Sequence, residues 1–206
     1  MGKGENIIVL VFGALFLLSL IMILNQGVKT TGYATTATTT SNVTISSYFA
    51  IAMSQNLSNG IQFGSVSTLP TTSQNATHNY DGVNTTAQNI TLNGTNGTSM
   101  WMNVSSDSNT AVDFCTKADA ALTTSGGSTI GVGNETYHNS TQTNITIPNI
   151  LSEVAFTTSY VKAGFNTSIG SNNYYRFWLD VPAGTASGSY NNTISFEGIA
   201  TGGACS

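Results

Sequence analysis

Apolar residues recur at every second position in short runs along most of this chain. A period of two is typical of a strand with one buried and one exposed face. Gly, Asn and Ser, which favour tight turns, bound the runs, and no long helical period appears after residue 30. The pattern predicts an all-β domain. Its expected strands fall within residues 43–53, 61–63, 90–92, 100–104, 112–114, 154–160, 175–181 and 190–196.

Turn signals separate several of these expected strands. Asn59-Gly60 favours positive φ and predicts a hairpin between residues 43–53 and 61–63. Pro182-Ala-Gly-Thr predicts the turn before the last strand, and Gly188-Ser-Tyr190 is similar to a tyrosine corner. Many short strands at this spacing favour an immunoglobulin-like β-sandwich.

One N-terminal hydrophobic helix is expected before this domain. Residues 7–24 form a run of 18 residues without a charge. As a helix the run would be about 27 Å long, close to the thickness of the hydrocarbon core of a bilayer. The run therefore predicts contact with a membrane, at least during export. Retention as an anchor is one reading, and cleavage after Ala34, which has Gly32 two residues before it, is the other.

The chain thus divides into three expected parts. Residues 1–34 are a signal sequence or a membrane or filament-core helix, residues 35–41 are a Thr-rich linker or a donated strand, and residues 42–206 are the β-sandwich domain. The last part is long enough for one hydrophobic core.

Charge is scarce, with five basic and nine acidic residues in the whole chain. After residue 34 the cations are Lys117, Lys162 and Arg176, and eight acidic residues oppose them. Because no basic stripe exists to neutralise phosphates, we do not expect a nucleic-acid partner. The polar surface must instead come from neutral side chains, which agrees with 32 Thr and 22 Asn residues.

The two cysteines, Cys115 and Cys205, lack the short spacing of a metal site or a redox motif. In an exported protein such a pair predicts one disulfide, which would tie the C-terminus to the core. The alternative is two free, partly buried thiols.

Acceptor motifs for N-glycosylation, Asn-x-Ser/Thr, occur 13 times. Asn89, Asn103, Asn144 and Asn191 fall on the outward face of expected strands, where a sugar would meet solvent. The alternative is that these are ordinary turn and surface residues. The full set is Asn42, Asn56, Asn75, Asn84, Asn89, Asn93, Asn96, Asn103, Asn134, Asn139, Asn144, Asn166 and Asn191.

No set of residues in the sequence predicts catalysis, a metal site or a cofactor. His78 and His138 stand in polar, loop-like surroundings without a nucleophile spaced to join them. Ser159 and Lys162 have the spacing of a Ser-x-x-Lys motif, but they fall in an expected strand, where the helical spacing of that motif fails. We therefore expect a protein that is not an enzyme. Asp81, Asp107, Asp113 and Asp119 are too scattered for a calcium loop.

Four residues fall on the outward face of expected strands. Arg176 and Asp180 are expected at the surface. For Trp101 and Trp178 we expect partial burial under loops, and the alternative is a subunit contact or a ligand patch.

Lys3-Gly4-Glu5, placed before a long apolar helix, resembles the processing site of type IV pilin-like proteins. The resemblance implies cleavage after Gly4, packing of the apolar helices into a filament core, and a β domain that faces outward.

Residues 174–185, Tyr-Tyr-Arg-Phe-Trp-Leu-Asp-Val-Pro-Ala-Gly-Thr, are similar to the closing hairpins of archaeal exported sandwich domains. With the composition, they make the chain resemble archaeal secreted surface β-sandwich glycoproteins, including pilin and thread filament subunits. This resemblance implies a non-enzymatic extracellular filament subunit with an adhesive role, located at the cell surface.

Such a subunit would form a homopolymer, either through packed N-terminal helices or by lending a strand within residues 38–50 to a neighbour's sheet edge. The alternative is a monomeric, membrane-anchored coat glycoprotein or adhesin that binds a cell-surface ligand.

Overall fold

The computed structural model of the chain describes residues 11–19, 21–22, 40–80 and 97–206, in two compact units, Met1–Thr44 and Ile45–Ser206. In the first unit, residues 11–19 and 21–22 are helical and their apolar side chains are exposed. Among the described residues, no helix has both the length and the apolar character needed to cross a membrane. The predicted cleavage positions Gly4 and Ala34, most of the linker and the expected strand at residues 90–92 lie outside the described residues.

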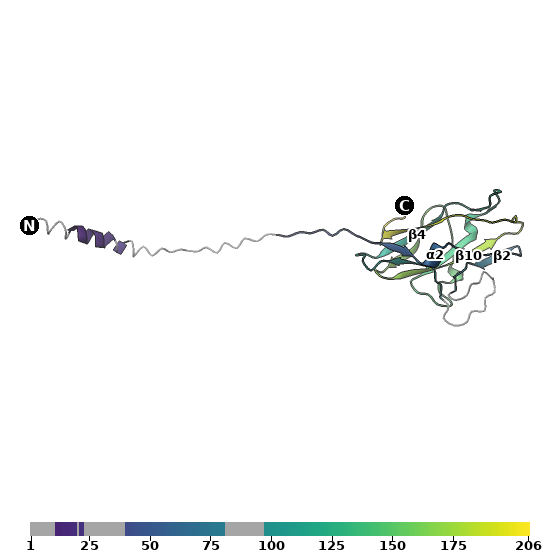
Figure 1. Cartoon of the computed structure of the whole chain (residues 1–206), viewed down its shortest axis with the longest axis horizontal. Helices are drawn as coiled ribbons and strands as arrows, with labels where there is room; N and C mark the ends of the chain where they lie inside the picture. The colour runs from purple at the N-terminus through teal and green to yellow at the C-terminus, as the bar shows by residue number, and fades with distance from the viewer. Residues whose placement is uncertain (1–10, 20, 23–39, 81–96) are drawn as a thin grey trace, which may run out of the picture. The chain divides into compact units, whose positions relative to one another are not determined.

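The second unit is all-β, as predicted, with several antiparallel sheets and little helix (Figure 1). Its strands are β1 (Ile51–Met53), β2 (Thr71–Asn75), β3 (Trp101–Val104), β4 (Val112–Ala118), β5 (Leu122–Thr123), β6 (Thr129–Ile130), β7 (Glu135–Ser140), β8 (Val154–Ala155), β9 (Val161–Thr167), β10 (Asn172–Val181) and β11 (Ile194–Ala200). Its helices are α2 (Gln55–Ser58) and the 3₁₀ helices η1 (Val132–Asn134) and η2 (Ile150–Ser152).

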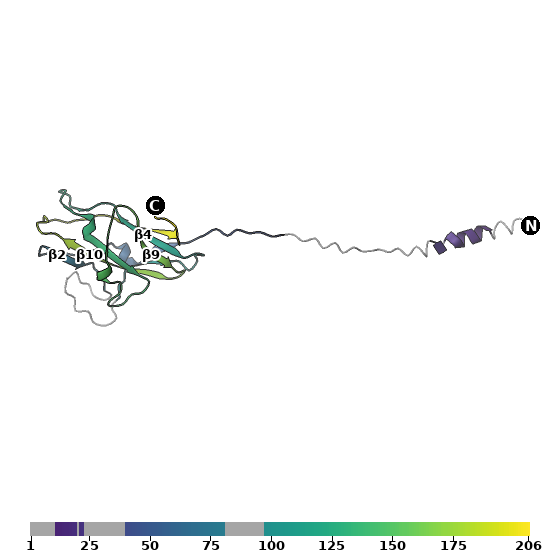
Figure 2. The same cartoon turned by 180° about the vertical axis from the view of Figure 1, so that it is seen from behind.

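The largest sheet is built around β10. One edge of β10 pairs with β3 along its first half and with β2 along its second half, while the other edge pairs with β7. The order of this sheet is β1-β3-β10-β7-β8, with β2 beside β10. A second sheet has the order β11-β4-β9, and β5 and β6 form a small hairpin. Figure 2 shows β9 beside β4 from behind.

The two larger sheets share one hydrophobic core. Tyr175 and Phe177 of β10 stack at 6.1 Å, and Tyr175 meets Phe196 of β11 edge-to-face at 5.3 Å. Phe114 of β4 is fully buried in the same cluster. These ring contacts fix the two sheets against each other, because aromatic pairs bury large areas in defined geometries.

The predicted strand over residues 43–53 is mostly wrong, because only Ile51–Met53 form a strand. Residues 46–50 bond instead to a loop: Asn109 donates its backbone N–H to the carbonyl of Tyr48 and its side-chain amide to that of Ser46. Val43 and Ile45 are 84% and 78% exposed, and no described strand pairs with them. The alternating pattern is therefore present, but without a partner strand.

The predicted hairpin at Asn59-Gly60 is also wrong, since β1 pairs with β3 rather than with residues 61–63. The Ser54 hydroxyl accepts a hydrogen bond from the Leu57 N–H and starts the short helix α2. Gly60 does adopt positive φ, at 100°, but it follows that helix and does not join two paired strands.

Both faces of β10 are buried, which corrects the surface location predicted for Arg176. The side chain of Arg176 is 1% exposed and donates hydrogen bonds to the carbonyls of Asn79 and Pro148. Trp178 is also 1% exposed, and its Nε1–H donates to the side-chain oxygen of Asn75 at 2.9 Å. Segments distant in sequence, around residues 75–80 and 144–148, cover this face.

Candidate functional site

β11 ends the three-stranded sheet, and one of its edges is open. Asp119 donates its N–H to the Thr193 carbonyl, and Thr201 donates to the Ala111 carbonyl. Because hydrogen-bonded positions alternate along an antiparallel pair, the backbone groups of Ile194, Phe196 and Gly198 point away from β4. No strand in the described part of the chain pairs with this edge. Such an edge is a template for another strand.

A groove of about 880 Å³, lined by both apolar and polar side chains, lies along the start of this edge. Ile194 and Phe196 of β11 line it, together with residues of the segment 57–69, of the β5–β6 hairpin and of the end of β10. Other apolar side chains in its lining are Met53, Leu57, Ile61, Phe63, Val66, Leu69, Leu122, Ile130, Leu179 and Val181.

A second hydrophobic cluster forms part of the lining of the groove. It consists of Leu122, Ile130, Leu179 and Val181. Tyr190 packs against this cluster and donates its hydroxyl to the carbonyl of Ala186 at 2.8 Å. This contact resembles the tyrosine corner expected from Gly188-Ser-Tyr190. It holds the loop that leads into β11, and so positions the start of the open edge.

Glu135, the first residue of β7, is buried and lines the groove. Burial raises the pKa of this carboxyl above 4.5, and the hydrogen bond from the Asn192 side-chain amide at 2.8 Å offsets part of the rise. A buried carboxyl with a raised pKa favours the protonated form, so its contribution to stability is lost as the pH rises through that pKa. Among the described residues that line the groove, Glu135 has the one carboxyl, and apolar side chains lie beside neutral polar ones such as Gln62 and Asn191.

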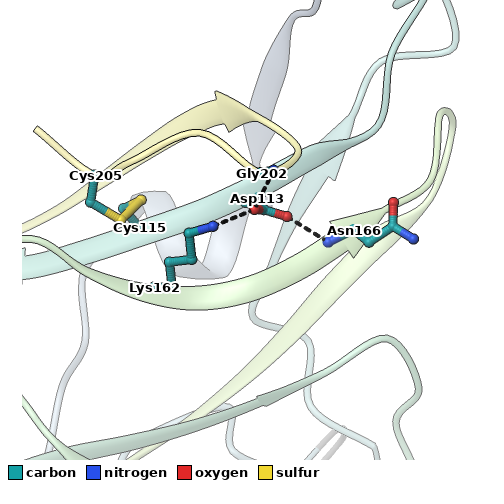
Figure 3. Close-up of polar contacts among 6 residues, drawn as sticks. All are labelled: Asp113, Cys115, Lys162, Asn166, Gly202 and Cys205. Atoms are coloured by element: carbon teal, nitrogen blue, oxygen red, sulfur yellow. Dashed lines mark hydrogen bonds and ion pairs between the residues drawn. A yellow bond between two sulfur atoms is a disulfide. The ribbon is translucent and has the colours of Figure 1, made fainter.

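The other edge of β11 pairs with β4, and further contacts tie the chain after β11 to β4. Cys115 of β4 and Cys205 form a disulfide across a sequence separation of 90 residues, which confirms the predicted pair. Asp113 of β4 accepts hydrogen bonds from the Gly202 N–H at 3.0 Å, the Lys162 ammonium at 2.7 Å and the Asn166 N–H at 2.8 Å (Figure 3). The chain after β11 is thus fixed by a covalent bond and by a shared carboxylate.

We expect Asp113→Asn to destabilise the domain in a pH-dependent way. Burial alone would raise the pKa of Asp113, but the donors of Asn166, Lys162 and Gly202 together hold it below 3.8. The stabilisation is therefore present above pH 3.8 and is lost as the pH falls through the lowered pKa. The substitution should cost about 2 kcal/mol near pH 7 and much less at about pH 2, as measured by urea unfolding.

The matched control for this prediction is Asp107→Asn, which changes an exposed carboxyl. Its unfolding curve should match that of the parent protein at both pH values. An equal loss for Asp113→Asn at both pH values would contradict a role for the charged carboxylate.

No protein-family model, curated protein or solved structure matches this chain. Its function must therefore be inferred from the open edge, the groove and the residues around them.

The 13 glycosylation motifs are placed unevenly. Asn42, Asn144, Asn166 and Asn191 are exposed, and Asn56, Asn103, Asn134 and Asn139 are half-buried. Asn84, Asn89, Asn93 and Asn96 lie outside the described residues. The exposed group remains the best set of predicted glycan acceptors.

Asn75 is the one described motif whose asparagine is buried. Its side-chain oxygen accepts hydrogen bonds from Trp178 and Asn79, so a glycan could not be added there without opening the fold. Among the positions predicted on outward strand faces, Asn103 lies on β3, and its amide donates to the side-chain oxygen of Asn172. Asn144 and Asn191 lie in loops rather than strands.

The remaining candidate residues do not come together. His138 lies on β7, not in a loop as predicted, and its Nδ1 accepts the Asn149 N–H at 2.9 Å while burial lowers its pKa. His78 lies in a turn after β2. Lys162 pairs with Asp113, and Ser159 is exposed. Within the described ranges, no group of three or more His, Cys, Asp or Glu residues could hold a metal ion.

The sequence did not predict the groove or its carboxyl. Glu135 stands two residues before Tyr137, a buried aromatic residue on the same strand. This alternation was a signal for its inward position. The open edge of β11 gave no such local signal, because it depends on the order of strands that are distant in sequence.

Proposed function

We propose that this protein is a non-enzymatic extracellular structural protein, a pilin-like subunit of a surface filament with an adhesive role. The observation that carries the proposal is the open edge of β11 beside a groove with exposed apolar side chains, in a chain whose residues 43 and 45 have a strand pattern without a described strand partner. An open sheet edge and a strand-like segment without a described partner, both on one molecule, favour contact between copies. A head-to-tail contact of this kind builds open polymers.

Two further features support a place outside the cell. The disulfide fits an oxidising compartment, and residues 7–24 have the composition of a segment that enters a membrane during export. The exposed Asn42, Asn144, Asn166 and Asn191 are available to glycans.

For the fold, we propose a β-sandwich, since the two larger sheets contribute to one core. An immunoglobulin-like strand connectivity remains a prediction, and the filament proposal does not depend on it.

The test is electron microscopy of the native cell-surface fraction, with intact mass and N-terminal sequencing of the same material. We expect filaments that contain this chain. A chain that begins at Glu5 within filaments would favour packed N-terminal helices, and one that begins near Thr35 would favour strand exchange. A chain that begins at Met1 in membranes, with no filaments, would contradict the proposal and favour the anchored coat glycoprotein or adhesin.

A further inference from the structure

We infer that the groove beside β11 is an acceptor site for residues 41–45 of a second copy of this chain, which add as a strand to the open edge. This inference rests on the proposed function and names the contact that would join the subunits. Three observations support it: the unpaired backbone groups of β11, the alternation of apolar side chains in residues 41–45, and the crowding at Gly198.

The backbone of β11 offers hydrogen bonds at alternate positions. The N–H and C=O groups of Ile194, Phe196 and Gly198 face the open side, and the side chains of Ile194 and Phe196 face the groove. In an antiparallel pair, a residue that bonds to such a position also places its side chain on the same face. An added strand would therefore put every second side chain into the groove.

Residues 41–45 match this requirement. Val43 and Ile45 are apolar, two positions apart, and 84% and 78% exposed. Asn42 and Thr44 would face outward, so the glycosylation motif that they form stays accessible in the joined state. From the first to the fifth residue a strand extends about 13 Å, which is also the span from Ile194 to Gly198.

Crowding at Gly198 favours a register that places a small residue opposite it. A side chain at this position would meet Ile51 at 3.0 Å, so the groove is closed on that side, whereas it is open at Ile194 and Phe196. An antiparallel strand with Val43 opposite Phe196 places Ile45 opposite Ile194, and both of these β11 residues line the groove. The small residue Ser41 then lies opposite Gly198. This register puts each apolar side chain of the segment where the groove has room.

The first test is a disulfide cross-link at the outward-facing pair that this register creates, Thr44 opposite Ser195. One preparation of the full chain carries Thr44→Cys and a differently tagged one carries Ser195→Cys. After mixing and mild oxidation, we expect a covalent dimer that contains both tags. The matched control replaces Ser195→Cys with Glu197→Cys, one pair out of register, and should yield at least about tenfold less dimer, since disulfides require close Cβ atoms.

The second test changes residues 41–45, the segment that would add as a strand. Val43→Asp with Ile45→Asp should abolish filament assembly and leave the thermal unfolding midpoint unchanged, because both side chains are exposed in the single copy. Leu151→Asp is the matched control, since Leu151 is 90% exposed and is not part of the lining of the groove. This variant should assemble as the parent chain does.

The outcomes separate the inference from the proposed function. Filaments that form with the doubly substituted segment, or without the Thr44–Ser195 cross-link, would overturn the acceptor site and leave the filament proposal intact. In a third preparation, whose chains carry both Thr44→Cys and Ser195→Cys, a cross-link that forms only within single chains would show that each copy fills its own groove, which also overturns the inference. Absence of filaments from native cells would overturn the proposed function itself.

Discussion

Removal of the disulfide should lower the free energy of unfolding of the domain by about 4 kcal/mol. The bond between Cys115 and Cys205 closes a loop with a sequence separation of 90 residues, and a cross-link over such a distance restricts the unfolded chain strongly. We expect this loss in the Cys115→Ala, Cys205→Ala double variant. Urea unfolding followed by the fluorescence of the buried Trp178 measures it.

Reduction of the unsubstituted protein provides the control, because it breaks the same bond without changing a side chain. A reducing agent should lower the unfolding midpoint of the parent protein and leave that of the double variant unchanged. Equal midpoints for both proteins under oxidising conditions would show that the bond adds little to stability.

Arg176→Ala should destabilise the domain by about 3 to 4 kcal/mol. The buried guanidinium donates to the backbone carbonyls of Asn79, Pro148 and Asn144 and lies over the ring of Tyr80 at 4.2 Å. Without it, these carbonyls lose donors in a site that water does not reach freely, and each unsatisfied group is costly. Thermal or urea unfolding at neutral pH measures the loss.

Lys117→Ala is the matched control, because Lys117 is a partly exposed cation that lies over the ring of Tyr160 at 4.3 Å. It should cost less than about 1 kcal/mol. If both substitutions cost the same, the buried contacts of Arg176 with the backbone would not be what stabilises the segments around Asn79 and Pro148.

Local alternation predicted the inward face of β10 correctly. Tyr175, Phe177, Leu179 and Val181 are all buried, because a period of two places them on one side of the strand. The same rule failed for Arg176 on the other face. Alternation says which residues share a face, but segments far away in the sequence decide whether that face is covered.

Strand pairing was predicted less well than strand location. The hairpin expected at Asn59-Gly60 rests on neighbouring residues, whereas the observed pairing of β1 with β3 joins Ile51 to Val104. Likewise, the motif at Asn75 is complete in the sequence, but its asparagine serves as a buried hydrogen-bond acceptor for Trp178. Short-range patterns carry no information about such long-range contacts.

Of the two parts of the proposed contact, the sequence indicated only the segment that contains Val43 and Ile45. The alternation of Val43 and Ile45 marked a strand, and the structure leaves these residues exposed without a described partner strand. The acceptor half depends on β11 being the edge of its sheet and on the packing of Ile194 and Phe196 beside residues 57–69. That arrangement exists only once the whole domain has folded.

The closed loop between Cys115 and Cys205 would also set the mechanical behaviour of a filament joined at β11. Pulling force would enter each subunit through this strand, and the disulfide limits how far the strand can be drawn from β4 to the length of the chain between Ala200 and Cys205. Under load, the residues within the loop could not be extended as a free chain. Only residues 46–114 and the short stretch between β11 and Cys205 could lengthen, so the disulfide would limit how far a stretched subunit can extend.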